Sequence, residues 1–152
     1  MARKWYGSVN NRIEEGRIRT EDGLIHKGDD ITMYYWSDRS CYFVTKVIDQ
    51  KHIFVKPYEV VADRSKPGGM GHQNWLYFKS RREANMYLNE FMKEEDKYPV
   101  DELVEAKEEE WVLRYGKWNR VVGTDENGKP IYRHLSGQIT IGVRDYYYDW
   151  EF

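Results

Sequence analysis

The chain has 152 residues, a formal net charge of −2 and an isoelectric point near 6.1. This length is enough for one domain with a hydrophobic core and too short for two, so we expect a single domain spanning residues 1–152. The near-neutral charge excludes the basic surface of a general nucleic-acid binder and the acidic excess of a whole-surface DNA mimic. Long nucleic acids are therefore not expected partners.

Aromatic side chains make up 16 % of the residues. Such large, stiff rings suit protein cores, protein interfaces and stacking platforms for nucleobases, and the composition leaves all three uses open. The single cysteine, Cys41, is expected to be a buried thiol in a reducing compartment. No signal segment or membrane-spanning stretch is found, so we expect a cytoplasmic protein without membrane contact.

In chain order, Ser8 predicts the N-cap of a short helix that ends at Gly16, followed by a polar loop over residues 17–29. Residues 30–64 are the richest in β-branched and aromatic side chains and predict the strands around which the fold is organised. Both faces of the first of these strands carry large apolar groups, so it is expected to be central or covered on both sides. Pro57 predicts an edge or a bend. The strands are expected over residues 31–36, 42–48, 53–56 and 58–61.

The second half begins with a glycine-rich loop over residues 65–71, which matches no phosphate-binding pattern. Ser80 and Glu83 have the spacing of a capping box and predict a helix over residues 80–96. Acidic residues then predict a second short helix over 101–110 with a solvated face. Further strands are expected over residues 75–78, 111–115, 118–122 and 139–143, with hairpin turns at Gly116 and Asn127-Gly128.

These elements predict an α+β fold: a twisted antiparallel sheet or small open β-barrel, a short N-terminal helix and an inserted helical arm at about residues 80–108. The apolar stripe of the arm is a candidate contact between copies of the chain. The aromatic C-terminus is expected to pack on the sheet or on another subunit.

The sequence offers no catalytic constellation. It lacks the nucleophile pattern G-x-S-x-G, and Cys41 has no evident histidine partner. The histidines are widely scattered and follow no metal-ligand spacing, so no metal site and no cofactor are predicted. We therefore expect a protein that is not an enzyme. The histidines are His26, His52, His72 and His134.

Four arginines lie in or beside the aromatic segments: Arg39, Arg64, Arg114 and Arg144. Arginine binds phosphate through two parallel N–H groups and stacks on bases. Several such arginines in a neutral, aromatic-rich domain favour an anionic small molecule that contains a base. The structural alternative is ion pairing with the adjacent aspartates Asp38, Asp63 and Asp145. We interpret Arg39 as such a turn-fixing ion pair.

Short motifs also carry a resemblance to known proteins. They are G-S-V-N-N-R-I at 7–13, W-S-D-R at 36–39, A-D-R at 62–64, G-M at 69–70, Y-F at 77–78, R-Y-G-K-W at 114–118 and G-V-R-D-Y at 142–146, followed by Asp149 and Phe152. In these motifs the chain resembles a group of small phage-encoded proteins that we identify with the Thoeris anti-defence type. The resemblance covers most of residues 5–78 and 111–152 and leaves 79–110 as an insertion.

The resemblance implies a non-enzymatic sponge. Such proteins assemble as homo-oligomers and bind cyclic ADP-ribose isomers made by bacterial TIR proteins, and some also bind cyclic oligonucleotides, in pockets between subunits. It implies phosphate contacts from Arg64 and Arg144. It implies stacking by Phe78 and Trp118. The other ligand-binding candidates at motif positions are Asn11, Arg12, Met70 and Tyr115.

One departure concerns residues 115–118, where this chain has Y-G-K-W and the group is expected to have N-G-R-W, so the ligand preference can differ. The expected function is to sequester a cyclic nucleotide immune signal in the cytoplasm of an infected bacterium without degrading it. The alternative is a protein-binding inhibitor of a host defence nuclease, such as a CRISPR effector, acting through exposed aromatic residues and the acidic residues 101–110. Direct single-strand binding is a third reading, which the near-neutral charge weakens.

Overall fold

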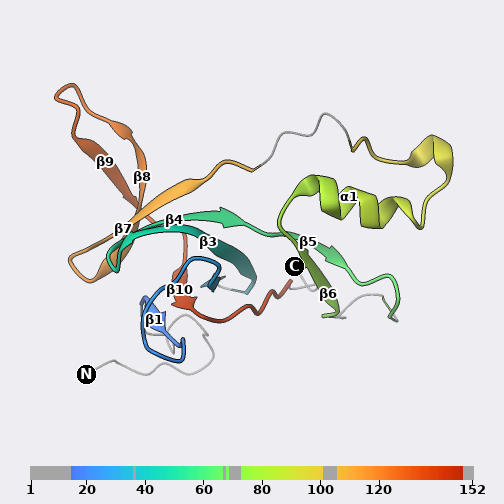
Figure 1. Ribbon diagram of the computed structural model, residues 1–152, viewed down its shortest axis with the longest axis horizontal. Coiled ribbons are helices and arrows are strands. Elements are labelled where there is room, and N and C mark those ends of the chain that lie inside the picture. Colours follow the sequence, from blue (N-terminus) through green and yellow to red (C-terminus); the bar gives the residue numbers. More distant parts are fainter. Residues whose placement is uncertain (1–14, 36, 67, 69–72, 101–105, 149–152) are drawn as a thin grey trace.

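The computed structural model describes residues 15–35, 37–66, 68, 73–100 and 106–148. Its main feature is a curled eight-stranded sheet shaped as a half-barrel, with strand order β1-β10-β2-β3-β4-β7-β8-β9 (Figure 1). Neighbouring strands are antiparallel except β1 and β10, which are parallel. The strands are β1 (Arg17–Ile18), β2 (Asp30–Tyr34), β3 (Arg39–Asp49), β4 (His52–Pro57), β7 (Glu109–Arg114), β8 (Lys117–Thr124), β9 (Pro130–His134) and β10 (Gln138–Ile141).

A smaller unit lies beyond one end of the large sheet. Strands β5 (Glu59–Ala62) and β6 (Trp75–Phe78) form a two-stranded ribbon on which helix α1 (Arg81–Asn89) packs. A 3₁₀ turn, η2 (Glu94–Asp96), follows α1. In Figure 1 this ribbon and the β8–β9 hairpin lie on opposite sides of the picture, along the longest axis.

The predicted α+β class is wrong, because the protein is mostly β. Strands hold 46 % of the described residues and helices hold 10 %. The predicted helical arm at 80–108 reduces to α1 and the 3₁₀ turn. Ser80 does cap α1, accepting a hydrogen bond from the Glu83 N–H. At the last residue of α1, the side chain of Asn89 bonds to both the N–H and the carbonyl of Tyr98, which holds the following chain against the end of the helix.

The predicted second helix over 101–110 fails for a non-local reason. Residues 101–105 lie outside the described residues, but Glu109 and Glu110 begin β7 and pair with β4. This pairing places the fully buried Trp111 in the core. Helix propensities of ordinary residues differ by about 0.7 kcal/mol at most, whereas burial of a large apolar side chain contributes about 1.5–3 kcal/mol. The predicted N-terminal helix over 8–16 falls mainly outside the described residues.

The core is formed by alternate residues on one face of the large sheet, as the period of two predicts. Residues 31–34 of β2 are all buried, and β2 lies between β10 and β3, which confirms the central position predicted for this strand. Pro57 ends β4 where the chain leaves the large sheet for the ribbon, as expected for a bend. The buried core cluster consists of Ile25, Ile31, Met33, Val44, Ile53, Val55, Trp111, Trp118, Ile139 and Ile141.

Residues 143–148, here called the C-terminal strap, tie the ribbon to the large sheet. On the sheet side, the buried Thr32 of β2 donates a hydrogen bond from Oγ1 to the Val143 carbonyl (2.6 Å). The same Oγ1 accepts a hydrogen bond from the Asp145 N–H (3.1 Å). Arg39 of β3 forms an ion pair with Asp145.

On the ribbon side, the strap contacts β6 and the residues before it. The Tyr146 N–H donates to the Tyr77 hydroxyl (2.9 Å), and the rings of Trp75 and Tyr146 meet edge to face at 4.8 Å. The Gln73 amide bonds to both the carbonyl and the N–H of Tyr148. The Tyr146 ring therefore packs on the ribbon, as predicted, whereas Tyr147 and Tyr148 are exposed although their backbone groups are hydrogen-bonded.

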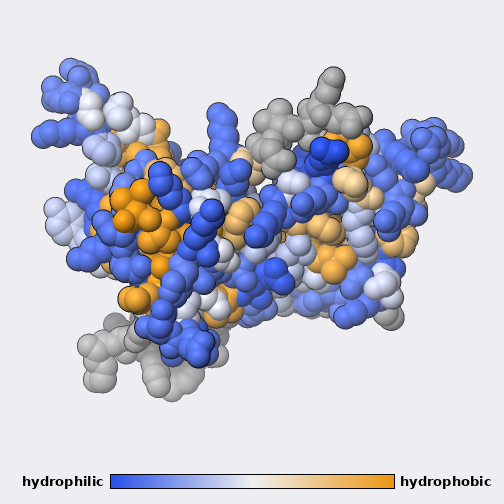
Figure 2. All heavy atoms as spheres, in the orientation of Figure 1, coloured by the Kyte–Doolittle hydropathy of each residue, from blue (hydrophilic) through white to orange (hydrophobic). Residues whose placement is uncertain are grey.

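On the face shown in Figure 2, hydrophobic atoms gather over the strands of the large sheet and again on the side of α1 and the ribbon. No helix in the described ranges is long and apolar enough to cross a membrane.

Candidate ligand-binding groove

The β7–β8 hairpin begins the candidate site. Arg114 pairs with Lys117, which leaves Tyr115 and Gly116 as a two-residue turn. Both turn residues have positive φ, +52° for Tyr115 and +76° for Gly116. Positive φ at both positions defines the type I′ turn, whose twist matches that of the flanking strands.

The pairing of β7 with β8 and of β8 with β9 places polar and aromatic side chains on one face of these three strands. Asn119 of β8 pairs with His134 of β9, and alternate residues share a face. The result is a cavity of about 410 Å³ lined by Arg114, Tyr115, Lys117, Asn119, Tyr132 and His134.

A second cavity, of about 290 Å³, adjoins the first and shares Lys117 and His134 with it. Its other lining residues are Glu15, Trp118 and residues 135–138. We call the two cavities together the Arg114 groove. Small-molecule sites usually have volumes of about 300–1,000 Å³. The first cavity lies within this range and the second lies just below it.

The groove is predominantly positive. The Arg114 guanidinium carbon lies 3.9 Å from the ring centre of Tyr132 and 5.4 Å from that of Tyr115. In the part of the chain that the structure describes, neither Arg114 nor Lys117 forms an ion pair with a carboxylate. Stacking uses the faces of the guanidinium and leaves its N–H edges for an anion. The arrangement therefore offers cations for phosphate groups and rings for a base.

Among the described residues that line the groove, Glu15 is the one acidic residue. Burial raises the pKa of its carboxyl above the usual value, while the backbone N–H of Trp118 and the charges of Lys117 and His134 oppose that rise. Glu15 therefore holds a proton at higher pH than an exposed glutamate does. Protonation removes the repulsion between Glu15 and an anionic ligand.

Trp118, a predicted stacking residue, is 2 % exposed. It pairs with Leu113 and points into the core, because it lies on the opposite face of β8 from Lys117 and Asn119, which line the cavity of about 410 Å³. Gly16 lies directly on the indole: a Cβ at Gly16 would come within 2.6 Å of the Trp118 Nε1. With so little of the indole exposed, Trp118 offers no open ring face to a ligand.

Arg144, a predicted phosphate contact, lies in the C-terminal strap beside the ribbon. Its guanidinium carbon is 4.2 Å from the ring centre of Tyr77 and 5.4 Å from that of Tyr58. The Tyr58 hydroxyl donates to Asp30, and burial raises the pKa of Tyr58 to about 12. Arg144 is thus held on an aromatic surface away from the Arg114 groove.

Phe78 and Arg64 lie on the α1 side of the ribbon. The Phe78 ring packs on Tyr87 of α1 at 5.6 Å, and the Arg64 N–H donates to the Tyr87 hydroxyl (2.7 Å). Consecutive strand residues face opposite sides, so Phe78 and Tyr77, the residue under Arg144, point apart. Within one chain Arg64, Phe78 and Arg144 therefore do not share a pocket with Tyr115 and Trp118, which line the Arg114 groove. Asn11, Arg12 and Met70 fall outside the described residues.

The ion pairs proposed as a structural alternative have different partners. Asp63 accepts hydrogen bonds from the N–H and Oγ of Ser65, which lower the pKa of its carboxyl. Arg39 is ion-paired, as predicted, but with the distant Asp145 of the strap.

Reasoning from sequence missed Lys117, Asn119, Tyr132 and His134 as lining residues. Their spacing of two on either side of the Asn127-Gly128 turn was the available signal, since alternate residues of paired strands share a face. Cys41 is buried as expected, and desolvation raises the pKa of its thiol to about 11. Among the described residues, no group of three or more metal-ligating side chains could hold an ion.

No protein-family model matches the chain, and neither a curated protein nor a solved structure matches it.

Proposed function

We propose that this protein binds an anionic nucleotide in the Arg114 groove and holds it without chemical change. The observation that carries the proposal is the Arg114 guanidinium, which lies on the Tyr132 ring inside a cavity that Lys117 and His134 also line. Cations beside flat rings suit a ligand with phosphate groups and a base.

Binding without chemistry has a biological use if the nucleotide is a signal. A protein in excess over the signal, with a lower dissociation constant than the receptor's, keeps the free signal below the level that activates the receptor. Following the resemblance of the sequence motifs, we propose that the ligand is a cyclic ADP-ribose isomer and that the protein is a phage anti-defence sponge. Assembly of several copies would offer a way to combine the Arg114 groove with the surface that carries Arg144.

The test begins with purified protein incubated in extract from TIR-expressing cells and then heated to release bound small molecules for mass spectrometry. We expect an intact cyclic nucleotide. Recovery of a converted nucleotide, or of none, contradicts the proposal. A thermal-shift panel of cyclic ADP-ribose, ADP-ribose and ADP then ranks the ligands, because a ligand of the folded form raises the melting temperature.

A matched pair of variants places the ligand. Arg114→Gln removes one charge from the groove, and Arg133→Gln removes the same charge from the residue between Tyr132 and His134, on the opposite face of β9. A charge-assisted hydrogen bond contributes about 1.5–3 kcal/mol, so Arg114→Gln should weaken nucleotide binding by about 10- to 150-fold in calorimetry. Equal losses in the two variants would show that the ligand binds elsewhere.

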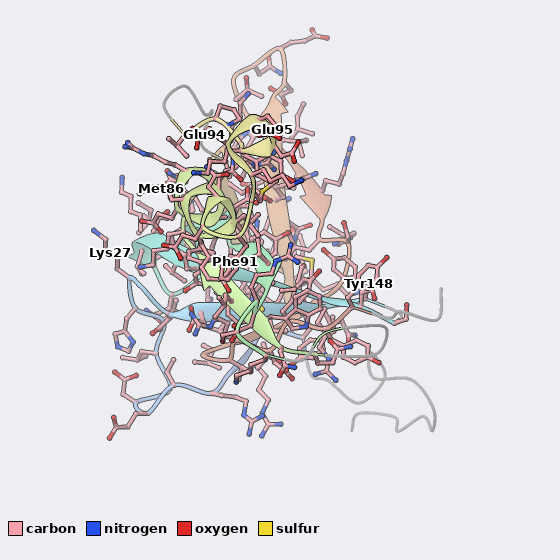
Figure 3. All side chains as sticks on the ribbon, turned by 90° about the vertical axis from the view of Figure 1, so that its right-hand side faces the viewer. Lys27, Met86, Phe91, Glu94, Glu95 and Tyr148 are labelled. Carbon is pink, nitrogen blue, oxygen red and sulfur yellow. The ribbon has the colours of Figure 1, made fainter. Side chains whose placement is uncertain are left out.

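A second candidate function, inhibition of a host nuclease by protein binding, is favoured by the surface around α1. Met86 and Phe91 are 52 % and 55 % exposed, and Figure 3 shows them on and just after α1, with Glu94 and Glu95 in the turn that follows. Exposed apolar side chains of this size mark a surface that can contact a protein partner. Co-purification of a nuclease, with no thermal shift from any nucleotide, would favour this function.

A further inference from the structure

Tyr115 has a backbone conformation that tyrosine rarely adopts. At φ +52° it is the one non-glycine residue with positive φ among the described residues. Its side chain is also 95 % exposed. The first position of a type I′ turn strongly favours asparagine, aspartate or glycine, since an ordinary side chain there crowds the backbone.

Neither the turn nor the core explains this tyrosine. A side chain exposed to this degree gains almost no burial energy that could offset the strained backbone. An asparagine at position 115 would serve the turn by itself. Unfavourable backbone conformations cluster at active sites, ligand clamps and switch regions. The tyrosine ring must therefore have a use outside the fold.

The position of the ring indicates that use. Tyr115 lines the cavity of about 410 Å³, and its ring centre lies 5.4 Å from the Arg114 guanidinium, which rests on Tyr132. A base that enters beside Arg114 meets Tyr115 as an exposed flat surface. We infer that Tyr115 is the specificity-determining residue of the groove: it stacks on the base and selects nucleotides over other anions. This inference rests on the proposed function and adds to it the requirement for a base.

The test compares Tyr115→Asn with the native protein by calorimetry, using two probes. One probe is the tightest-binding nucleotide of the thermal-shift panel, and the other is inorganic pyrophosphate, which has no base. Loss of base–aromatic stacking should weaken nucleotide binding by about 5- to 150-fold. Pyrophosphate binding should fall by a smaller factor. Tyr115→Phe, which keeps the ring, should lose less nucleotide affinity than Tyr115→Asn.

A second readout separates ligand selection from folding. Relief of turn strain should raise the melting temperature of Tyr115→Asn by about 2–4 °C for each kcal/mol recovered. The variant would then be more stable and bind less well, which general damage to the fold cannot produce. Tyr98→Asn, which changes an exposed tyrosine near α1, is the matched control and should leave nucleotide binding as it is in the native protein.

The outcomes distinguish failure of the role of Tyr115 from failure of the proposed function. If the native protein binds the nucleotide and Tyr115→Asn binds it equally well, the role of Tyr115 is refuted and the proposed function stands. Equal losses for nucleotide and pyrophosphate also refute the selective role. If the native protein binds neither probe, the proposed function fails and the role of Tyr115 fails with it.

Discussion

The C-terminal strap should depend on one buried hydroxyl, that of Thr32. The Thr32 Oγ1 donates to the Val143 carbonyl at 2.6 Å and accepts from the Asp145 N–H at 3.1 Å, and the side chain is fully buried. Thr32→Val keeps the shape and the β-branching but removes both hydrogen bonds. Each buried polar group left without a partner costs about 1–3 kcal/mol. For two partly buried groups we expect a loss of about 2–4 kcal/mol.

The assay is urea unfolding of the native protein, Thr32→Val and Thr32→Ser. The serine variant keeps the hydroxyl and loses one methyl group, which should cost about 1 kcal/mol. Release of the strap should also expose the ribbon, so limited proteolysis of Thr32→Val should cut faster within residues 58–98. If Thr32→Val loses no more stability than Thr32→Ser and its cleavage pattern is unchanged, the hydroxyl does not anchor the strap.

Two further predictions concern the stability of the fold. The raised pKa of Glu15 means that the folded protein binds this proton more tightly than the unfolded chain, whose carboxyl has a pKa near 4.5. The stability that protonated Glu15 contributes is therefore complete below pH 4.5 and is lost as the pH rises through the pKa of the folded protein. Above that pKa, Glu15→Gln should melt at a higher temperature than the native protein. An unchanged melting profile would contradict the burial of the charge. Gly137→Ala should destabilise by about 1–3 kcal/mol in urea unfolding, because the added Cβ would lie 2.3 Å from the Tyr34 carbonyl oxygen. Gly123→Ala is the control, with no heavy atom within 4 Å of its added Cβ, and an equal loss there would contradict a steric cause.

The groove and the surface around Arg144 have the same kind of contact, an arginine guanidinium that lies over a tyrosine ring. In the groove Arg114 lies on Tyr132, and beside the ribbon Arg144 lies on Tyr77. Stacking orders a flexible side chain before a ligand arrives, which reduces the entropy that binding must remove. Both arginines are thus positioned within an almost neutral protein before any ligand arrives.

The sequence by itself determined most of the strands. The density of β-branched and aromatic residues in β2 and β4, the break at Pro57 and the two-residue turn around Gly116 are local signals, and each corresponds to an element of the fold. The capping-box pair Ser80 and Glu83 likewise marks the start of α1. Backbone conformation and side-chain alternation act within a few residues, so a single sequence contains them.

Only the tertiary structure decided which residues meet. The acidic segment that suggested a helix contributes Glu109 and Glu110 to β7, because pairing with β4 buries Trp111. Register turns Trp118 into the core and sends Phe78 to the α1 side of the ribbon. These outcomes depend on pairing between strands that lie far apart in the chain. A shift of this pairing by one residue would exchange the buried and the exposed side chains of a strand.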